Sequence, residues 1–209
     1  MHEPEEVIAV RRILKLSMVL VAVLVYLSCP IFGLSEELKK SIYDPGKLKP
    51  IDSVLKVKVG EIAPDFVLPS VSGEKIALHQ FHGKKNVVIS FVPAAWTPVC
   101  SEQWPGYNIV KDVFSETDAV LLGITVDNIP TLHAWTNQIG GVWFHVLSDF
   151  WPHGEVAKTY GVLRSDGVTE RALFIVDKEG FLRFIQVTDI NKKPDPSVCA
   201  LELRKLKKK

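Results

Sequence analysis

The chain has 209 residues, enough for one domain with a substantial core and an additional segment. Apolar residues make up 47% of it, and the formal net charge is +1. This balance indicates neither a nucleic-acid-binding protein nor one that binds strongly acidic partners. The lysines at the carboxyl end are typical of a solvated tail.

The first 34 residues differ from the rest of the chain. Arg11, Arg12 and Lys15 precede residues 16–34, a run that has no charged side chain. A helix needs roughly 20 apolar residues to cross a bilayer, and this run has that length. Basic residues ahead of such a run stay in the cytoplasm and send the remainder across. Residues 1–34 are therefore predicted to be a signal peptide or membrane anchor, formed by one apolar helix.

Three fates of this segment stay open. Residues 26–29 loosely resemble a lipoprotein signal, which would place a lipid on Cys29. Residues 33–35 offer small side chains for cleavage, and an uncleaved anchor is the third alternative. In each case we expect the domain outside the cytoplasm, anchored or exported, on the periplasmic side if the cell is bacterial.

The cysteines and histidines do not form a structural framework. Cys29, Cys100 and Cys199 are too few for a disulfide scaffold, and no Cys-x-x-Cys occurs. His79 and His82 lie in a loop rich in Lys and Gly, without an acidic or thiol neighbour at ligand spacing. The sequence therefore predicts no metal site and no cofactor.

A linker is predicted at residues 35–56, where Lys, Asp, Pro and Gly are mixed, and the domain at residues 57–209. Residues 66–69 and 76–78 favour a small hairpin. Pro69 places it at the edge of a sheet, because proline does not fit a central strand.

Strands and helices alternate after this hairpin. The predicted elements are strand 87–92, helix 98–116, strand 119–126, helix 130–139, strand 142–147, helix 154–160, strands 172–176 and 181–187 joined by a turn, and helix 196–206. Near-continuous apolar strands that alternate with helices are typical of a sheet covered on both faces. We therefore expect an α/β fold with a central mixed β-sheet flanked by helices.

Cys100 lies where a buried strand passes into a helix. The connection reads Pro-Ala-Ala-Trp-Thr-Pro-Val-Cys over residues 93–100, with Thr97 suited to the N-cap and Pro98 to the first helical position. Cys100 then falls in the first turn, where backbone N–H groups lack helical partners and favour a negative sulfur. A helix terminus contributes only about 0.3–1 kcal/mol, so a stable thiolate also needs a nearby cation.

The spacing of Pro93, Thr97 and Cys100, Pro-x-x-x-Thr-x-x-Cys, resembles the peroxidatic signature of peroxiredoxins. Residues 60–66 are similar to the opening of that family's domain, and Arg171 stands where the family has its active-site arginine. The similarity is greatest to the bacterioferritin-comigratory or AhpE-like branch. It implies a thioredoxin-like fold.

The resemblance also implies a thiol peroxidase. Cys100 would attack hydrogen peroxide or an organic hydroperoxide and become a sulfenic acid, which an external thioredoxin-like or small thiol would reduce. Arg171 would stabilise the thiolate and the peroxide oxygens, Thr97 would bind the peroxide, and Pro93 would form a wall of the pocket. No cofactor, metal or nucleic acid is implied; the membrane is a partner through residues 1–34, and a homodimer is left open.

Alternatives remain for the second half of the cycle and for the function. Some similar proteins carry a second cysteine five residues after the first, where this chain has Pro105. A disulfide between Cys100 and Cys199 is therefore an alternative to a one-cysteine cycle. The competing functions are an exported thiol–disulfide oxidoreductase, in which Thr97 would replace the first thiol, and a non-catalytic thioredoxin-like binding module.

Overall fold

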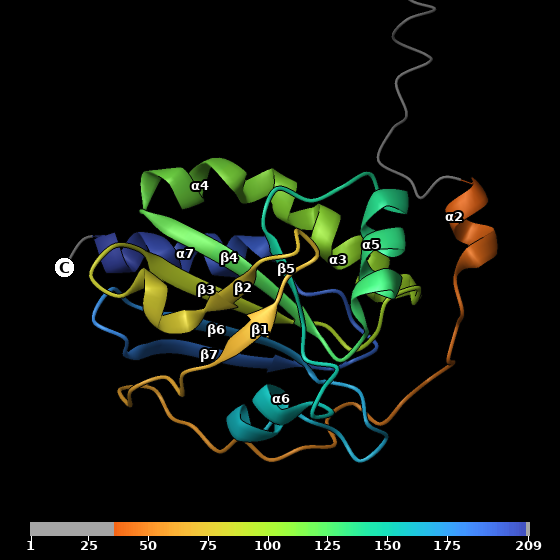
Figure 1. Ribbon diagram of the computed structural model, residues 1–209, viewed down its shortest axis with the longest axis horizontal. Helices are drawn as coiled ribbons and strands as arrows, with labels where there is room; N and C mark the ends of the chain where they lie inside the picture. Colours follow the sequence, from red (N-terminus) through yellow and green to blue (C-terminus); the bar gives the residue numbers. More distant parts are fainter. Residues whose placement is uncertain (1–35, 208–209) are drawn as a thin grey trace, which may run out of the picture. The chain divides into compact units, whose positions relative to one another are not determined.

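A computed structural model describes residues 36–207 (Figure 1). The predicted signal peptide or anchor at residues 1–34 lies outside the described residues. In the part that the structure describes, no helix is both long and apolar enough to cross a membrane.

A five-stranded mixed sheet forms the centre of the domain. Its strands are β3 (Asn86–Phe91), β4 (Ala119–Thr125), β5 (His145–Ser148), β6 (Arg171–Val176) and β7 (Leu182–Thr188), in the order β5-β4-β3-β6-β7. Strands β3, β4 and β5 are parallel, whereas β6 is antiparallel to both β3 and β7. Every residue of the central strand β3 is buried, as its apolar and β-branched composition predicts.

Helices and a hairpin complete the domain. The helices are α2 (Glu36–Ser41), α3 (Pro98–Gly106), α4 (Lys111–Glu116), α5 (Ile129–Gln138), α6 (Glu155–Tyr160) and α7 (Pro196–Lys207), and 3-10 turns occur at Leu78–Phe81 and Tyr107–Val110. The strands β1 (Val67–Pro69) and β2 (Lys75–Ala77) form a separate antiparallel hairpin, as predicted. Both α5 and α7 have side-chain caps, because Asn128 accepts from Thr131 N at 3.0 Å and Asp195 accepts from Ser197 N at 2.8 Å.

The sheet separates two hydrophobic cores because successive side chains of a strand point to opposite faces. Val87, Ile89 and Phe91 of β3 pack in one core with the β1–β2 hairpin and α6. Val88 packs in the other, with α3, α4, α5 and α7. Figure 1 shows α6 on one side of the sheet and these four helices on the other. The predicted α/β fold with flanking helices is confirmed.

Two expectations about local structure need correction or extension. The single helix predicted over residues 98–116 is wrong, since α3, a 3-10 turn and α4 follow one another there. Pro105 lies inside α3, and a proline lacks the N–H that would continue the α-helical ladder. The linker predicted at residues 35–56 contains α2, and its residues 42–56 have no helix or strand but form hydrogen bonds to the domain (orange in Figure 1).

Gly123 of β4 allows the helix that carries Cys100 to lie close to the sheet. A Cβ at this position would lie 2.7 Å from a ring carbon of Trp104 and 2.9 Å from one of Phe144. Trp104 is fully buried and packs on Trp135 with ring centroids 4.8 Å apart. The absence of a side chain at position 123 thus sets the distance between α3 and β4.

The substitution Gly123→Ala is expected to lower the free energy of unfolding by about 1–3 kcal/mol, because the added methyl overlaps the Trp104 ring. Chemical denaturation followed by tryptophan fluorescence measures this loss. Gly106→Ala is the matched control, since a Cβ there meets nothing within 4 Å and Gly106 has a helical backbone. Equal stability of the two variants would contradict the packing described for Trp104.

Candidate active site

Cys100 and Arg171 meet although 71 residues separate them in the sequence. Cys100 is the third residue of α3, and Arg171 is the first residue of β6. Because Phe91 pairs with Ala172 in the antiparallel β3–β6 ladder, the connection after β3 and the start of β6 lie at the same edge of the sheet. Both side chains are buried, and Nη1 and Nη2 of Arg171 each lie 3.6 Å from the Cys100 sulfur.

The guanidinium of Arg171 has neutral acceptors as its other partners. The Ile190 carbonyl accepts from Nε at 3.3 Å and from Nη2 at 3.0 Å. The Gln103 side-chain oxygen accepts from Nη1. Within residues 36–207, no carboxylate forms an ion pair with Arg171. Among these described partners of Arg171, the Cys100 sulfur is the one that can become an anion.

Sequence reasoning did not assign Gln103 a role. Its signal was its spacing, because residues three apart on a helix lie on the same face, and Gln103 follows Cys100 by three. The Gln103 amide nitrogen in turn lies 3.4 Å from the Ser90 hydroxyl, which also accepts from the Tyr107 hydroxyl at 3.1 Å. Gln103 thus connects the guanidinium to the core of the sheet.

Thr97 occupies the N-cap position of α3 and Pro98 its first helical position, as predicted. The expected side-chain cap does not form, because the Thr97 hydroxyl donates to the Ala94 carbonyl at 2.9 Å instead. Trp96 has a φ of 62°, a left-handed conformation that is uncommon for a residue with a side chain. This turn sends the chain from the strand into the helix and aims Thr97 back along the connection.

Neighbouring strands fix the connection between β3 and α3. The Asp127 carboxylate accepts from Ala95 N at 2.8 Å and from the Thr125 hydroxyl at 2.6 Å. The buried Thr169 hydroxyl donates to the Val92 carbonyl at 2.7 Å, directly before Pro93. The connection is thus bonded from both sides, by the end of β4 and by the segment before β6.

A pocket of about 830 Å³ opens over this region. Its walls come from four parts of the chain: Tyr43, Asp44, Pro45, Gly46, Lys47 and Leu48; Pro93, Ala94, Thr97, Pro98 and Val99; Asp166, Val168 and Arg171; and Ile190 with Asn191. Three predicted site residues, Pro93, Thr97 and Arg171, share this pocket, and the fourth, Cys100, contacts Arg171. The lining is mainly apolar, with Arg171 as the charged group nearest the sulfur.

Cys199 of α7 is buried and borders a second cavity that Arg171 also lines. Gln103, Tyr107, Arg171 and Cys199 line this second, small cavity. Both Cys100 and Cys199 are free thiols. Burial raises the pKa of Cys199 to about 12 and that of Tyr107 to about 12, so both groups are neutral near pH 7.

No cluster of three or more metal-ligating side chains occurs within residues 36–207. The groups that meet at the site are the Cys100 thiol, the Arg171 guanidinium and the Thr97 hydroxyl. A buried cation beside a buried thiol can stabilise a thiolate and, after it, the negative charge that develops on an oxygen.

Comparison with known proteins assigns the chain to a family. Residues 59–185 match the AhpC/TSA family. Alkyl hydroperoxide reductase E of Mycobacterium tuberculosis strain H37Rv is 36% identical over 132 residues, which are 63% of this chain and 86% of that protein. Peroxiredoxin TSA1-B of Candida albicans is 35% identical over 142 residues, covering 63% of this chain and 71% of that protein.

Solved structures show the same fold. The reduced 2-Cys peroxiredoxin of Plasmodium vivax superposes with a TM-score of 0.68 and 28% identity, over 73% of this chain and 83% of that one. Peroxidoxin BcpB of Mycobacterium tuberculosis gives a TM-score of 0.63 and 26% identity, over 72% of this chain and 98% of that one. The chain therefore belongs to the AhpC/TSA family of peroxiredoxins and is a thiol peroxidase.

Proposed function

We propose that this peroxidase reduces hydrogen peroxide or organic hydroperoxides through a sulfenic acid on Cys100. One observation carries the proposal: the buried guanidinium of Arg171 faces the buried Cys100 sulfur from 3.6 Å, and its other described partners are neutral. A buried charge is costly unless it is compensated. Ionisation of Cys100 supplies that compensation and makes the sulfur a nucleophile.

The first step forms an S–O bond and breaks the O–O bond. The Cys100 thiolate attacks the terminal oxygen of the hydroperoxide, and the other oxygen leaves as hydroxide or alkoxide, which takes up a proton to give water or an alcohol. Arg171 stabilises the charge as it moves onto the leaving oxygen. The Thr97 proton is engaged by the Ala94 carbonyl, so the hydroxyl has lone pairs left to accept a hydrogen bond from the peroxide.

The second step restores the thiol. An external thiol attacks the sulfenic acid, which releases water and leaves a mixed disulfide, and a second thiol then releases Cys100 and departs as a disulfide. Burial of Cys199 and its raised pKa keep it a protonated and therefore weak nucleophile. We infer a one-cysteine cycle with an external reductant.

The pocket supports a substrate larger than hydrogen peroxide. Pockets that hold small organic ligands have volumes of about 300–1,000 Å³ and mainly apolar walls. The pocket beside Arg171 has about 830 Å³, and Pro45, Leu48, Pro93 and Val168 contribute apolar wall. Organic hydroperoxides are therefore included in the proposed substrate class.

Replacing Arg171 by Ala should slow oxidation of Cys100 by a hydroperoxide by about 10²–10³-fold, because one transition-state donor and the charge beside the sulfur are lost. Rapid mixing followed by intact-mass analysis of the full chain measures oxygen gain at Cys100, with Cys100→Ser as the blank. Arg171→Lys keeps the charge without the planar fork and should fall between the two.

Arg183→Ala is the matched control, since Arg183 pairs with Asp177 near the opposite end of the same sheet. It should oxidise at the wild-type rate. A wild-type chain that gains no oxygen and forms no adduct at Cys100 would falsify the peroxidase mechanism. Folded Arg171→Ala with the wild-type rate would remove Arg171 from it.

Substituting Cys199 by Ser is expected to leave peroxide-dependent turnover with a small-thiol reductant unchanged, because Cys199 is buried and protonated in the reduced enzyme. Turnover is followed by consumption of the thiol. Recovery of a Cys100–Cys199 disulfide after one equivalent of peroxide would contradict the one-cysteine cycle.

We further propose that the enzyme acts outside the cytoplasm, as the basic and apolar pattern of residues 1–34 predicts. A carboxyl-terminal phosphatase reporter that is active only after export should be active on the full chain and inactive when residues 1–34 are deleted. Reporter activity that survives the deletion would refute export through this segment.

A further inference from the structure

Residues 43–52, here called the strap, lie outside the part of the chain that matches the family. Six consecutive strap residues, Tyr43 to Leu48, nevertheless line the pocket that contains Arg171 and Thr97. The strap has no helix or strand of its own, so its position depends on hydrogen bonds to the rest of the domain. Those bonds reach three segments of the candidate active site.

The amino-terminal end of the strap is bonded to the connection that carries Thr97. Tyr43 N donates to the Trp96 carbonyl at 2.8 Å. Trp96 is the residue with the left-handed backbone, directly before Thr97. The bond therefore contacts the turn from which α3 begins.

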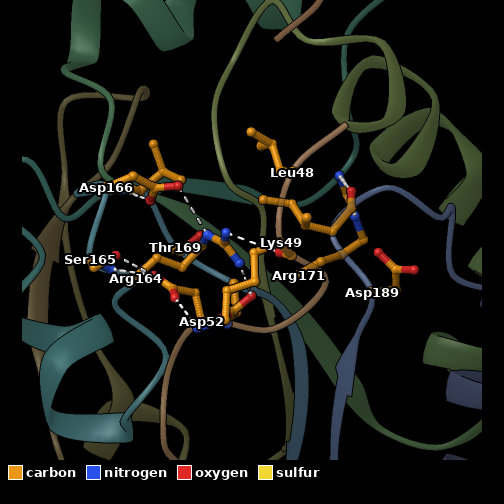
Figure 2. Close-up of polar contacts among 12 residues, drawn as sticks. Leu48, Lys49, Asp52, Arg164, Ser165, Asp166, Thr169, Arg171 and Asp189 are labelled. Carbon is orange, nitrogen blue, oxygen red and sulfur yellow. Dashed lines mark hydrogen bonds and ion pairs between the residues drawn. The ribbon is translucent and has the colours of Figure 1, made fainter. Parts of the chain in front are cut away.

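The carboxyl-terminal end of the strap is hydrogen-bonded to a buried ion pair (Figure 2). Arg164 and Glu170 are both buried and pair at 2.9 Å. Arg164 Nη2 also donates to the Lys49 carbonyl at 3.1 Å, and Glu170 Oε1 accepts from Asp52 N at 2.5 Å. The Asp52 carboxylate in turn accepts from the Ser165 backbone N–H at 3.0 Å and from the Ser165 hydroxyl.

The middle of the strap is held by Asn191. The Asn191 side chain accepts from Leu48 N at 2.9 Å and donates to the Leu48 carbonyl at 2.9 Å, so it pairs with the strap as a neighbouring strand would. It also donates to the Asp189 carboxylate at 2.8 Å. Beside it, Ile190 N donates to the Pro50 carbonyl at 3.1 Å. Three bonds thus join the strap to residues 190 and 191.

Ile190 links the strap to the reactive centre. Its N–H is bound by the strap, and its carbonyl accepts two hydrogen bonds from Arg171, at 3.3 Å and 3.0 Å. That carbonyl occupies one edge of the guanidinium, while the nitrogens Nη1 and Nη2 approach the Cys100 sulfur. A shift of residues 190–191 would therefore move the guanidinium relative to the sulfur.

We propose that the strap is a positioning element of the peroxidase site and that Asn191 is the positioning residue that couples it to Arg171. The proposal rests on the proposed role of Arg171 in activating Cys100. It adds a segment outside the family region to the parts of the chain on which the chemistry depends. Asn191 acts through Ile190 and Arg171 and needs no contact with the peroxide.

The test is the substitution Asn191→Ala in the full chain, which removes both side-chain bonds to Leu48 and the bond to the Asp189 carboxylate. Loss of alignment near a reacting centre can cost up to about 100-fold, so we expect Cys100 oxidation to slow by about 10–100-fold. The pH profile of Cys100 alkylation by iodoacetamide should also move to higher pH, since the cation is less well held beside the sulfur. A role in folding alone would not move this profile.

Other charged groups near the site do not produce such a shift. Tyr107 and Cys199, both with pKa values raised to about 12 by burial, stay neutral over the range of the titration. Asp44, Lys47 and Asp166 line the pocket and are present in wild type and variant alike. Asp189 loses the bond from the Asn191 side chain but keeps the one from Asn191 N at 3.0 Å, which also lowers the pKa of its carboxyl, so this group stays ionised. A difference between the two profiles therefore reports on Arg171 and Cys100.

Asn128→Ala is the matched control. It also removes an asparagine side chain that accepts from a backbone N–H, here at the N-cap of α5. We expect a stability loss of about 1 kcal/mol and an unmoved pH profile. Asp52→Asn is a second test, for use if Asn191→Ala does not fold. It weakens the bonds to Ser165 at the far end of the strap and should shift the pH profile in the same direction as Asn191→Ala, but by less.

The outcomes separate the two proposals. A folded Asn191→Ala chain with wild-type rate and profile overturns the positioning role, as does an equal slowing in Asn128→Ala. If Asn191→Ala does not fold, an unshifted profile in Asp52→Asn overturns it. If Arg171→Ala itself oxidises Cys100 at the wild-type rate, the proposed function of Arg171 fails, whatever the strap does.

Discussion

The structure around the reactive centre depends on a buried positive charge that lacks a carboxylate partner among the described residues. Arg171 is 2% exposed, and it is held by the Ile190 carbonyl and the Gln103 amide oxygen. Neutral acceptors satisfy the N–H groups of a guanidinium but leave its charge uncompensated. The Cys100 sulfur lies 3.6 Å from two nitrogens of this guanidinium, and the proposed function rests on that contact.

The sheet topology explains how this contact arises from distant parts of the sequence. Parallel strands β3 and β4 end at one edge, and the antiparallel strand β6 begins there. Cys100 follows β3 by one short connection, and Arg171 opens β6. Gly123 adds a second constraint, because the missing side chain lets Trp104 bring α3 close to the sheet. The site is therefore set by backbone pairing and one close approach rather than by loops alone.

Most of the fold could be predicted from the sequence, because apolar runs such as residues 87–92 and 119–126 have one buried solution in an α/β domain. The juxtaposition of Cys100 and Arg171 followed from the family resemblance and not from periodicity. The role of Gln103 was missed because helical spacing places it on the same face as Cys100 but does not identify Arg171 as its hydrogen-bond partner. The strap was predicted as a linker because most of its hydrogen bonds to the domain use backbone groups, which leave no pattern of apolar side chains.

The buried ion pair of Arg164 and Glu170 bears on where the chain can be truncated at its amino end. Each of these buried side chains forms a hydrogen bond with the strap: Arg164 donates to the Lys49 carbonyl, and Glu170 accepts from the Asp52 N–H. A fragment cut at residue 59, where the family region starts, would lose both hydrogen bonds and the segment that makes them. A truncation for expression or crystallisation that begins at residue 43 or earlier keeps these bonds, which the family boundary at residue 59 would not indicate.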